Sequence, residues 1–355
     1  MPSVLVAMSG GVDSSVAACL LHEQGYDVLG SHMRLVQLDG VDHGCCGPSA
    51  RSDAAETARI AGFPFEICDL TEEFEETVLA DFASEHEAGR TPNPCARCNG
   101  EIKFGAFLRR ADELGIDMVA SGHYVRRAEG AAGWRLLRGV DRAKDQSYML
   151  HMLGQRALAR SLFPVGELPK AKTRALAERF GLPVATKPDS QELCFAPSGN
   201  AGAYTRANLP HLVRDGEVVD PAGVVIGRHE GVSAFTIGQR RGTGVAAGER
   251  RYVVDVDAAA NRVVVGPGEL LDRRGLVADR FSWIAGERPA GGPFEAEVRI
   301  RSRGDDVRCA VEPIGVDRVR LEFRSPQRAV APGQSAVLYR GDEVLGGGRI
   351  VEAIR

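Results

Sequence analysis

The N-terminal third of the chain alternates short apolar runs with amphipathic segments. Val4–Ala7 is an unbroken apolar run typical of a buried strand, and Val16, Leu20 and Leu21 form the apolar stripe of a helix that ends at Gly25. Further strands are predicted at Val28–Met33, Phe65–Cys68 and Met118–Ser121, and helices at Ser49–Ala61, Thr71–Glu87 and Glu101–Leu114. Strands separated by helices predict a mostly parallel sheet, whose ligands bind beyond the carboxyl ends of the strands.

The rest of the chain has a different pattern. Between residues 126 and 210 it is less regular, with a strand predicted at Trp134–Asp141, a polar loop at Lys144–Tyr148 and a basic helix at Lys170–Phe180. From residue 216, short alternating runs separated by turn residues predict β-structure, including a hairpin of Arg251–Asp257 with Arg262–Val265. Glu295–Arg303 and Arg318–Arg324 carry arginines on one face and apolar residues on the other; the apolar residues are Val298, Ile300, Val319, Leu321 and Phe323. We therefore predict a small C-terminal barrel.

Length and composition extend this picture. A chain of 355 residues predicts two or three domains, and we place an α/β parallel-sheet domain at 1–207, a β-rich central domain at 208–272 and a β-barrel at 273–355. Apolar and charged contents of 44% and 26% are those of a soluble protein, and no apolar run approaches the ~20 residues that cross a bilayer. We expect a cytoplasmic monomer with no membrane partner. The net charge of −4 does not by itself indicate a nucleic-acid binder.

The first apolar run leads into Ser9-Gly10-Gly11-Val12-Asp13-Ser14-Ser15. Two glycines before a helix N-terminus let backbone amides converge on an anion, which predicts a phosphate site; the plain alternative is a tight turn with a serine cap. Neither the P-loop nor the dinucleotide-binding pattern is matched. The segment resembles the PP-loop of ATP pyrophosphatases, which implies that it holds the pyrophosphate of ATP. The predicted ATP site comprises Ala7, Met8, Ser9, Gly10, Gly11, Val12, Asp13 and Ser14, with Met33 and Gly122 from the ends of neighbouring strands.

Cysteines form the second group of candidate residues. The sequence has eight and no secretion signal, so we expect reduced thiols that serve in catalysis, metal binding or packing. Cys95 and Cys98 are placed in a proline-rich loop just before a helix N-terminus, which stabilises thiolate. Together with Cys194 they are compatible with half a zinc site, with a redox pair, or with sulfur transfer through a persulfide and a disulfide. The other cysteines are predicted to be core residues at positions 19, 68 and 309, with the pair at 45 and 46 unassigned.

Seven motifs together resemble the tRNA-specific 2-thiouridylase family, over residues 9 to 337. They are Ser-Gly-Gly-Val-Asp-Ser-Ser, Thr-Pro-Asn-Pro-x-x-x-Cys-Asn, Ser-Gly-His-Tyr, Lys-Asp-Gln-Ser-Tyr, Lys-Pro-Asp-Ser-Gln-Glu-x-Cys-Phe, Gly-Gln-Arg-Arg-Gly and Pro-Gly-Gln-Ser-Ala-Val. The resemblance implies that ATP, with Mg²⁺, adenylates the C2 oxygen of the wobble uridine of tRNA. A persulfide on Cys194, loaded by a sulfur-relay protein or a cysteine desulfurase, then delivers sulfur, and Cys98 is the nucleophile that ends in a Cys98–Cys194 disulfide.

The same resemblance assigns contacts with the RNA. Asn93, Pro94 and Cys95 are expected at the target base, and tRNA contacts are expected from His123, Lys144, Asp145, Gln146, Arg301, Ser302 and Gln334. Two positions depart from the family pattern, because Cys95 stands where some relatives carry an aspartate and Ser302 where many carry a tyrosine. Two other functions remain open: a different adenylating PP-loop ligase, and an iron–sulfur or zinc protein with Cys95, Cys98 and Cys194 as ligands.

Overall fold

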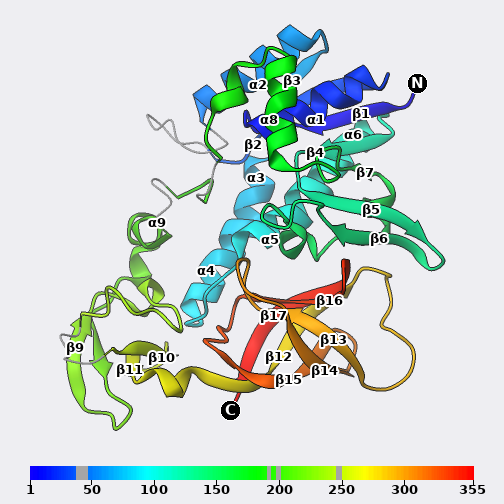
Figure 1. The fold of residues 1–355 in the computed structure, drawn as a ribbon. Coiled ribbons are helices and arrows are strands. Elements are labelled where there is room, and N and C mark those ends of the chain that lie inside the picture. Colours follow the sequence, from blue (N-terminus) through cyan, green and yellow to red (C-terminus); the bar gives the residue numbers. More distant parts are fainter. Residues whose placement is uncertain (37–46, 190–192, 197–200, 245–249) are drawn as a thin grey trace.

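The computed structural model describes residues 1–36, 47–189, 193–196, 201–244 and 250–355 (Figure 1). Its N-terminal sheet has the order β3-β2-β1-β4-β7, and every neighbouring pair of strands is parallel. The strands are β1 (Ser3–Ala7), β2 (Asp27–Arg34), β3 (Phe65–Asp69), β4 (Met118–Ser121) and β7 (Ser161–Leu162). This confirms the predicted parallel sheet, because each of the four apolar runs forms a strand.

Helices cover this sheet. α1 (Val12–Glu23) packs against α8 (Lys170–Arg179) and α2 (Pro48–Ala61). The predicted helix at 71–87 is present as α3 (Thr71–Phe74), the π-helical η2 (Glu75–Leu79) and α4 (Ala80–Glu87). The smaller helical elements are η4 (Ser147–Leu150), α7 (Gln155–Ala159), η5 (Pro183–Thr186), α9 (Ala201–Asn208), η7 (Pro210–Leu212), η8 (Val232–Ala234) and η9 (Gly268–Leu271).

One helix begins earlier than predicted. α5 (Pro94–Cys98), the π-helical η3 (Asn99–Ala106) and α6 (Phe107–Glu113) follow one another without a break, so the two thiols lie in the first turns of this helix and not in a loop before it. The cause is local, because the Asn93 side chain caps the helix by accepting a 3.3 Å hydrogen bond from the Ala96 amide. Pro94 then occupies the first turn, where its fixed φ favours the helix.

The central domain is built on a small sheet of order β10-β11-β8-β9. The predicted hairpin is confirmed as antiparallel β10 (Tyr252–Asp257) and β11 (Arg262–Gly266). β11 also pairs in parallel with β8 (Gly216–Val219), which in turn pairs with β9 (Val225–His229). Its core consists of Val218, Phe235, Val253, Val263 and Val265.

The C-terminal strands close into the predicted barrel. Their order is β12-β15-β14-β13-β16-β17, and pairing of β12 with β17 closes the ring. These strands are β12 (Asp272–Trp283), β13 (Phe294–Arg299), β14 (Val307–Ile314), β15 (Arg318–Arg328), β16 (Ser335–Arg340) and β17 (Glu343–Ile354). All five apolar residues predicted to face inward are buried. The first predicted strand is too long, however, because the chain turns after Arg299 and Gly304 donates to the Arg301 carbonyl.

A hairpin from the first part of the chain extends the barrel sheet. β5 (Val125–Gly130) pairs with β6 (Gly133–Arg138), and β6 pairs with β17 through Leu136 and Val344. The predicted strand Trp134–Asp141 therefore ends three residues early, where the chain leaves the sheet. One hydrophobic core runs across this junction, since the cluster that holds Leu5 also holds Val337 and Tyr339. The N-terminal sheet and the barrel are thus packed together.

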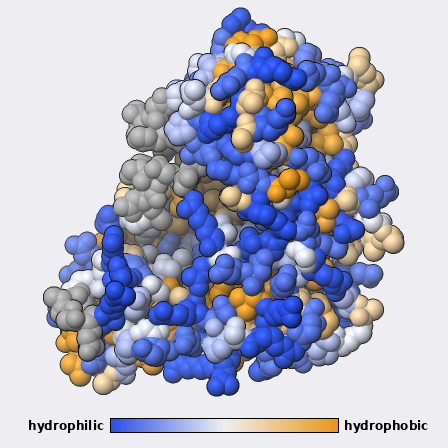
Figure 2. Space-filling view, in the orientation of Figure 1, coloured by the Kyte–Doolittle hydropathy of each residue, from blue (hydrophilic) through white to orange (hydrophobic). Residues whose placement is uncertain are grey.

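The face in Figure 2 is mainly hydrophilic, with scattered apolar residues. Among the described helices, none has the length and apolar character needed to span a membrane.

Candidate nucleotide and thiol site

The Ser-Gly-Gly segment is a tight turn between β1 and α1. Gly10 has φ +68°, and a Cβ there would lie 2.0 Å from the Ala50 carbonyl oxygen, so both its conformation and its surroundings require glycine. Gly11 caps α1 without a side-chain hydrogen bond. The Ser14 hydroxyl is used within the turn, because it accepts from the Ser9 amide at 3.2 Å and donates to the Gly11 carbonyl at 3.1 Å. The turn therefore presents a helix N-terminus to the carboxyl edge of the sheet.

Gly122 is placed against this turn, which explains why the position is glycine. A Cβ on Gly122 would lie 2.5 Å from the Ser14 amide nitrogen and 2.6 Å from the Asp13 carbonyl carbon. The missing side chain thus lets the end of β4 approach the backbone of α1. Met33 lies at the end of β2, half-buried against the hydrophobic core. Both residues are at the carboxyl edge, as the strand order requires.

Asp13 is bound by protein groups. The Lys170 ammonium donates to both carboxylate oxygens at 2.7 and 2.8 Å, and the Tyr124 hydroxyl donates at 2.7 Å. Lys170 is 9% exposed, and its ammonium also lies 2.7 Å from Asp189. One buried cation therefore joins Asp13 of the Ser-Gly-Gly turn to an aspartate from a distant segment.

Two more lysines reach the same place. Lys187 donates to the Gly10 carbonyl at 3.1 Å and to Asp53 at 2.5 Å, and Lys144 donates to Asp189 at 2.8 Å. Burial alone would raise the pKa of Asp189, but hydrogen bonds from Lys144 and Lys170 outweigh it and lower this pKa to about 2. Sequence reasoning missed Lys170 and Lys187. A signal existed, because the chain has only five lysines and three of them converge here.

The candidate thiols differ in their surroundings. Cys98 is 6% exposed, Cys95 is exposed on the same helix, and Cys194 is half-buried. Cys194 packs against the hydrophobic cluster that contains Cys98, and the next residue, Phe195, stacks edge-on against Phe82 and Tyr204. The described cysteines are all outside disulfides. In the described part of the chain, no three His, Cys, Asp or Glu side chains lie close enough together to hold a metal ion.

The other cysteines follow the prediction where they are described. Cys19, Cys68 and Cys309 are buried, and burial raises the pKa of their thiols to about 11, 11 and 12 respectively. They are therefore core residues. The pair at 45 and 46 lies outside the described residues.

The residues predicted to contact tRNA lie in two separate regions of the structure, and the first region contains residues 123 and 144–146. Asp145 has a side chain that is 2% exposed and faces inward, accepting hydrogen bonds from Gly139 and Ser147. Lys144 belongs to the Asp189 cluster, as described above. Gln146 accepts from the Tyr124 amide at 2.9 Å, and the His123 ring is hydrogen bonded to the Ser121 hydroxyl at 2.8 Å. All four residues lie on the segments that follow β4 and β6.

The barrel supplies the remaining predicted contacts. Gln334 donates to the carbonyls of Thr91 and Pro92, both at 3.0 Å, and thereby holds the segment that leads to Asn93. Arg301 and Ser302 are exposed in the turn after β13, where Arg301 donates to the Arg328 carbonyl. The structure thus brings Gln334 next to the helix that carries Cys95 and Cys98, whereas Arg301 and Ser302 lie on a barrel turn.

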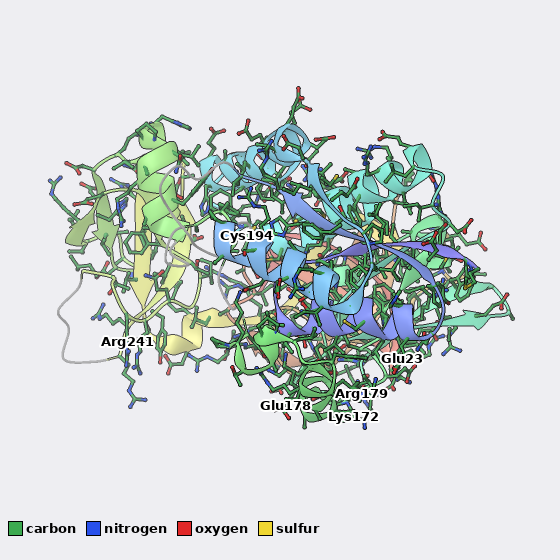
Figure 3. All side chains as sticks on the ribbon, turned by 90° about the horizontal axis from the view of Figure 1, so that it is seen from above. Glu23, Lys172, Glu178, Arg179, Cys194 and Arg241 are labelled. Carbon is green, nitrogen blue, oxygen red and sulfur yellow. The ribbon has the colours of Figure 1, made fainter. Side chains whose placement is uncertain are left out.

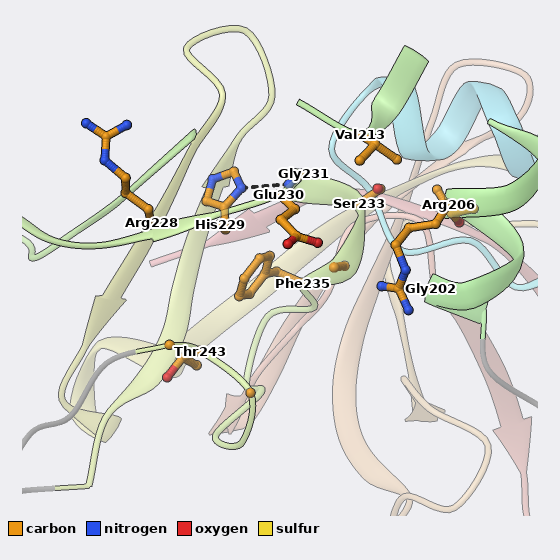
Figure 4. A pocket seen from close by; sticks show the side chains of 14 residues that line it. Gly202, Arg206, Val213, Arg228, His229, Glu230, Gly231, Ser233, Phe235 and Thr243 are labelled. Atoms are coloured by element: carbon orange, nitrogen blue, oxygen red, sulfur yellow. Dashed lines mark hydrogen bonds between the residues drawn. The ribbon is translucent and has the colours of Figure 1, made fainter. Parts of the chain in front are cut away.

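A separate cavity of about 280 Å³ lies between α9 and the central domain (Figure 4). Arg206, His229, Phe235 and Thr243 are among its lining residues, and the His229 ring accepts a 3.0 Å hydrogen bond from the Gly231 amide. Among the described residues predicted to serve ATP, the thiol chemistry or tRNA, none lines this cavity. It is therefore distinct from the nucleotide and thiol site.

The fold and the site define a three-part protein with a HUP-type α/β domain at its N-terminus. Residues 2–198 match the family model for the tRNA methyl transferase HUP domain, residues 209–267 that for the tRNA methyl transferase PRC-barrel domain, and residues 273–350 that for the aminomethyltransferase β-barrel domain. The domain borders predicted after residues 207 and 272 stay predictions.

Curated relatives match nearly the whole chain. The chain is 44% identical over 369 residues to the tRNA-specific 2-thiouridylase MnmA of Roseiflexus castenholzii, covering 99% of both chains. It is 45% identical over 361 residues to the protein of the same name from Symbiobacterium thermophilum, covering 99% of this chain and 92% of the relative. The chain belongs to the tRNA-specific 2-thiouridylase family.

A solved 4-thiouridine synthetase–RNA complex with bound ATP matches more weakly. It is 16% identical, has a TM-score of 0.36, and covers 59% of this chain and 50% of its own. At this score the likeness adds no argument to the family assignment.

Proposed function

We propose that the protein is an ATP-dependent tRNA-uridine 2-sulfurtransferase that makes 2-thiouridine at the wobble position of tRNA. The observation that carries this proposal is the 44 to 45% identity, over 99% of this chain, to relatives named tRNA-specific 2-thiouridylase. The Ser-Gly-Gly turn at a helix N-terminus supports ATP as the activating substrate. The accessible cysteines at positions 95 and 194 and the buried Cys98 support thiol chemistry.

The first proposed step activates the uracil. The C2 oxygen attacks the α-phosphorus of ATP, pyrophosphate leaves, and the oxygen becomes bonded to AMP. The amides of Gly10 to Ser14 hold the pyrophosphate, and Met33 and Gly122 border the nucleotide. Mg²⁺ usually binds phosphates and waters with one or two carboxylates. Asp13, in the first turn of α1, would be one such ligand if the triphosphate drew Lys170 away from its oxygens. Such a cation supplies charge neutralisation of the phosphates.

The second proposed step transfers sulfur. The terminal sulfur of a Cys194 persulfide attacks C2, and the C2–O bond breaks to release AMP. The Cys98 thiolate then attacks the Cys194 sulfur, which breaks the S–S bond, leaves one sulfur on C2 and forms a Cys98–Cys194 disulfide. A thiol reductant and a persulfide donor protein restore the enzyme. Asn93, Pro94 and Cys95 receive the target base once it has left its stack.

The remaining predicted residues serve tRNA binding in this proposal. Arg301 and Ser302 are exposed and suit contact with the RNA backbone, and His123, Lys144 and Gln146 border the nucleotide site. Asp145 and Gln334 have an indirect role in this proposal, because their polar atoms are hydrogen bonded to protein groups. They hold in place the chain segments that contact the tRNA.

The test is incubation with unmodified tRNA, ATP and a sulfide source, followed by mass analysis of nucleosides and measurement of pyrophosphate. We expect 2-thiouridine from the wild type, and loss of at least about 10³-fold for Cys194→Ser with pyrophosphate release retained. Cys309→Ala, which removes a buried barrel thiol, is the control and keeps activity. Thiouridine formation by Cys194→Ser would overturn the persulfide role, and absence of both products from the wild type would overturn the function.

The metal-cluster alternative has its own measurement. A visible spectrum and metal analysis of anaerobically purified protein report a cluster bound by Cys95, Cys98 and Cys194. A stoichiometric cluster that activity requires would replace the persulfide scheme while leaving the tRNA substrate unchanged.

A further inference from the structure

Glu85 is a buried carboxylate that neither proposed reaction step uses. It lies on α4, and its side chain is 1% exposed. The Arg90 guanidinium donates to both of its oxygens, at 2.6 and 2.8 Å, and Arg349 of β17 donates to one of them. Burial alone would raise the pKa of Glu85, but the hydrogen bonds and charges of these two arginines outweigh it and lower this pKa. Glu85 is therefore an ionised link between the N-terminal domain and the barrel.

Arg349 holds the barrel end of this link. It also forms a two-pronged pair with Asp279 of β12, at 2.9 and 2.6 Å. In the pairing of β16 with β17, Arg349 lies directly opposite Ser335, and opposed residues project from the same face of a sheet. Ser335 is in turn hydrogen bonded to the Asn93 amide. Two neighbouring side chains of the barrel thus hold the two ends of the segment 90–93.

Further contacts hold the middle of that segment. The Thr91 amide donates to the Pro332 carbonyl at 2.9 Å, and the Thr91 hydroxyl donates to the Thr236 hydroxyl of the central domain at 3.2 Å. Gly333 has φ +92°, and a Cβ there would lie 2.6 Å from the Thr91 carbonyl oxygen. All three domains therefore meet at Thr91, two residues before the cap of the helix that carries the thiols.

The position of Cys98 depends on this segment. α5 begins at Pro94, directly after the segment 90–93, and Cys98 is its last residue. Because the first turn of a helix sets where its later residues lie, a shift of the segment moves the Cys98 thiol. A displacement of about 1 Å in a reacting group can cost about 100-fold in rate. The contacts of Glu85 can therefore influence a reaction in which Glu85 takes no chemical part.

We propose that Glu85 is a positioning residue, which fixes the start of the Cys98 helix against the barrel through Arg90 and Arg349. This inference rests on the proposed function, in that Cys98 is taken as the nucleophile and Asn93–Cys95 as the place of the target base. The Ser-Gly-Gly turn is bound by other groups, as described above. Replacement of Glu85 is therefore expected to slow thiolation and to leave ATP binding unchanged.

The first measurement needs neither tRNA nor ATP. Iodoacetamide labels the thiols of the full-length protein, and mass spectrometry reads each rate on its own peptide; trypsin separates Cys98 from Cys95 by cleaving after Arg97. For Glu85→Gln we expect Cys98 to be labelled about tenfold faster or more, because a buried thiol is reached through local opening of its helix. Cys68 and Cys309, buried in β3 and in the barrel, are expected to keep their rates.

The second measurement is single-turnover thiolation together with calorimetric titration of ATP. For Glu85→Gln we expect the rate of 2-thiouridine formation to fall about tenfold or more, with ATP affinity within about twofold of the wild type. Arg90→Lys is the conservative variant, because it keeps a cation beside Glu85 but loses the two-pronged contact. It is expected to show smaller changes than Glu85→Gln in both measurements.

Two control variants remove acidic groups elsewhere. Glu87→Gln is the matched control, because Glu87 lies on the same helix, is 53% exposed and pairs with His211 at 3.0 Å. Glu23→Gln breaks the 2.7 Å ion pair with Arg179, at an edge that Figure 3 shows well away from Cys194. Both are expected to behave like the wild type.

Arg90→Gln replaces Glu85→Gln if that variant does not fold. The Arg90 side chain is 29% exposed, and the Glu85 carboxylate keeps its pair with Arg349 in this variant. The same faster labelling of Cys98 and slower thiolation are expected.

The outcomes separate this inference from the proposed function. An unchanged Cys98 rate in the folded variant overturns the positioning role, and so does an equal acceleration of Cys68 and Cys309, which would report a general loss of stability. Faster labelling of Cys98 with wild-type thiolation also overturns it. Absence of 2-thiouridine from the wild type overturns the proposed function alone, and the labelling rates then still decide whether Glu85 fixes the start of the helix.

Discussion

The Asn93 side-chain amide donates a 3.0 Å hydrogen bond to the hydroxyl of Ser335, across 242 positions of sequence. Asn93 caps the helix that carries Cys95 and Cys98, and Ser335 is the first residue of β16 in the barrel. The same hydroxyl is hydrogen bonded to the His151 ring at 3.1 Å. The barrel therefore fixes the start of the helix on which the proposed nucleophile lies.

Ser335→Ala tests this support. The change leaves the Asn93 amide without its barrel partner, which we expect to lower the free energy of unfolding by about 1 to 2 kcal/mol. Thiolation is expected to fall several-fold at unchanged ATP affinity, because the cap of the helix shifts while the nucleotide turn does not. Urea unfolding and single-turnover thiolation are the measurements. Ser325→Ala, at an exposed position of β15, is the control; equal losses in both variants would contradict the assignment.

Gly122→Ala tests the contact between β4 and α1. A Cβ 2.5 Å from the Ser14 amide cannot be accommodated by a side-chain movement, so the first turn of α1 must shift. We expect ATP affinity to fall at least about tenfold, corresponding to about 1.4 kcal/mol. The control is Gly154→Ala, because Gly154 has φ −88° and nothing within 4 Å of the new Cβ. Calorimetric titration with ATP measures both, and wild-type affinity in Gly122→Ala would refute the expectation.

Arg138 is a buried charged residue at the junction between the hairpin and the barrel. Its side chain is 2% exposed, binds Asp306 at 2.7 Å and stacks 3.6 Å above the Tyr339 ring. Arg138→Leu is expected to cost about 3 kcal/mol, because the buried carboxylate of Asp145, 3.6 Å away, loses a cation. On the same strand, Arg135 pairs with Glu343 at 3.3 Å with 45% exposure, so Arg135→Leu is expected to cost at most about 1 kcal/mol. Urea unfolding compares the two variants. Similar losses of free energy of unfolding would show that burial of the arginine does not decide the cost.

Two buried histidines predict acid sensitivity. Burial lowers the pKa of both His86 and His151 to about 4. In the unfolded chain these rings take up protons near pH 6.5, so between pH 6.5 and 4 the unfolded state binds more protons and stability falls as pH falls. Each contributes up to about 1.4 kcal/mol per pH unit, and the contribution is fully present above pH 6.5. Urea unfolding from pH 7 to 4.5 measures how steeply the free energy of unfolding depends on pH. His151→Gln should reduce this dependence, and an unchanged dependence in the variant would contradict the role given to His151.

Local patterns were sufficient to predict most elements of the fold. The apolar runs at Val4 and Met118 form the central strands β1 and β4, where burial on both faces leaves an unbroken apolar signature. The runs at Val28 and Phe65 form β2 and the edge strand β3, which are less completely buried. The inward positions of the barrel follow from simple alternation. The helix start at Pro94 does not follow from the local pattern, because two prolines close together indicate a loop, although Asn followed by Pro is also a helix start.

Long-range relationships were not accessible from the sequence. The pairing of Leu136 with Val344 could not be predicted, because the hydrophobic pattern within a strand does not identify the distant strand with which it pairs. The burial of Asp145 and the convergence of Lys170 with Asp13 depend in the same way on packing between segments. The candidate site was therefore predicted as a set of residues, while the connections among them required the structure.

The pairing of β6 with β17 has a consequence for the order in which the protein is completed. Translation produces the β5–β6 hairpin, which ends at Arg138, long before it produces β17 (Glu343–Ile354). The edge of β6 that later pairs with β17 is therefore open at first. That edge stays unpaired while the nucleotide-binding half can already fold. We expect nascent chains truncated before residue 343 to be more prone to aggregation than the full chain, and a separately expressed N-terminal fragment to need a protecting partner.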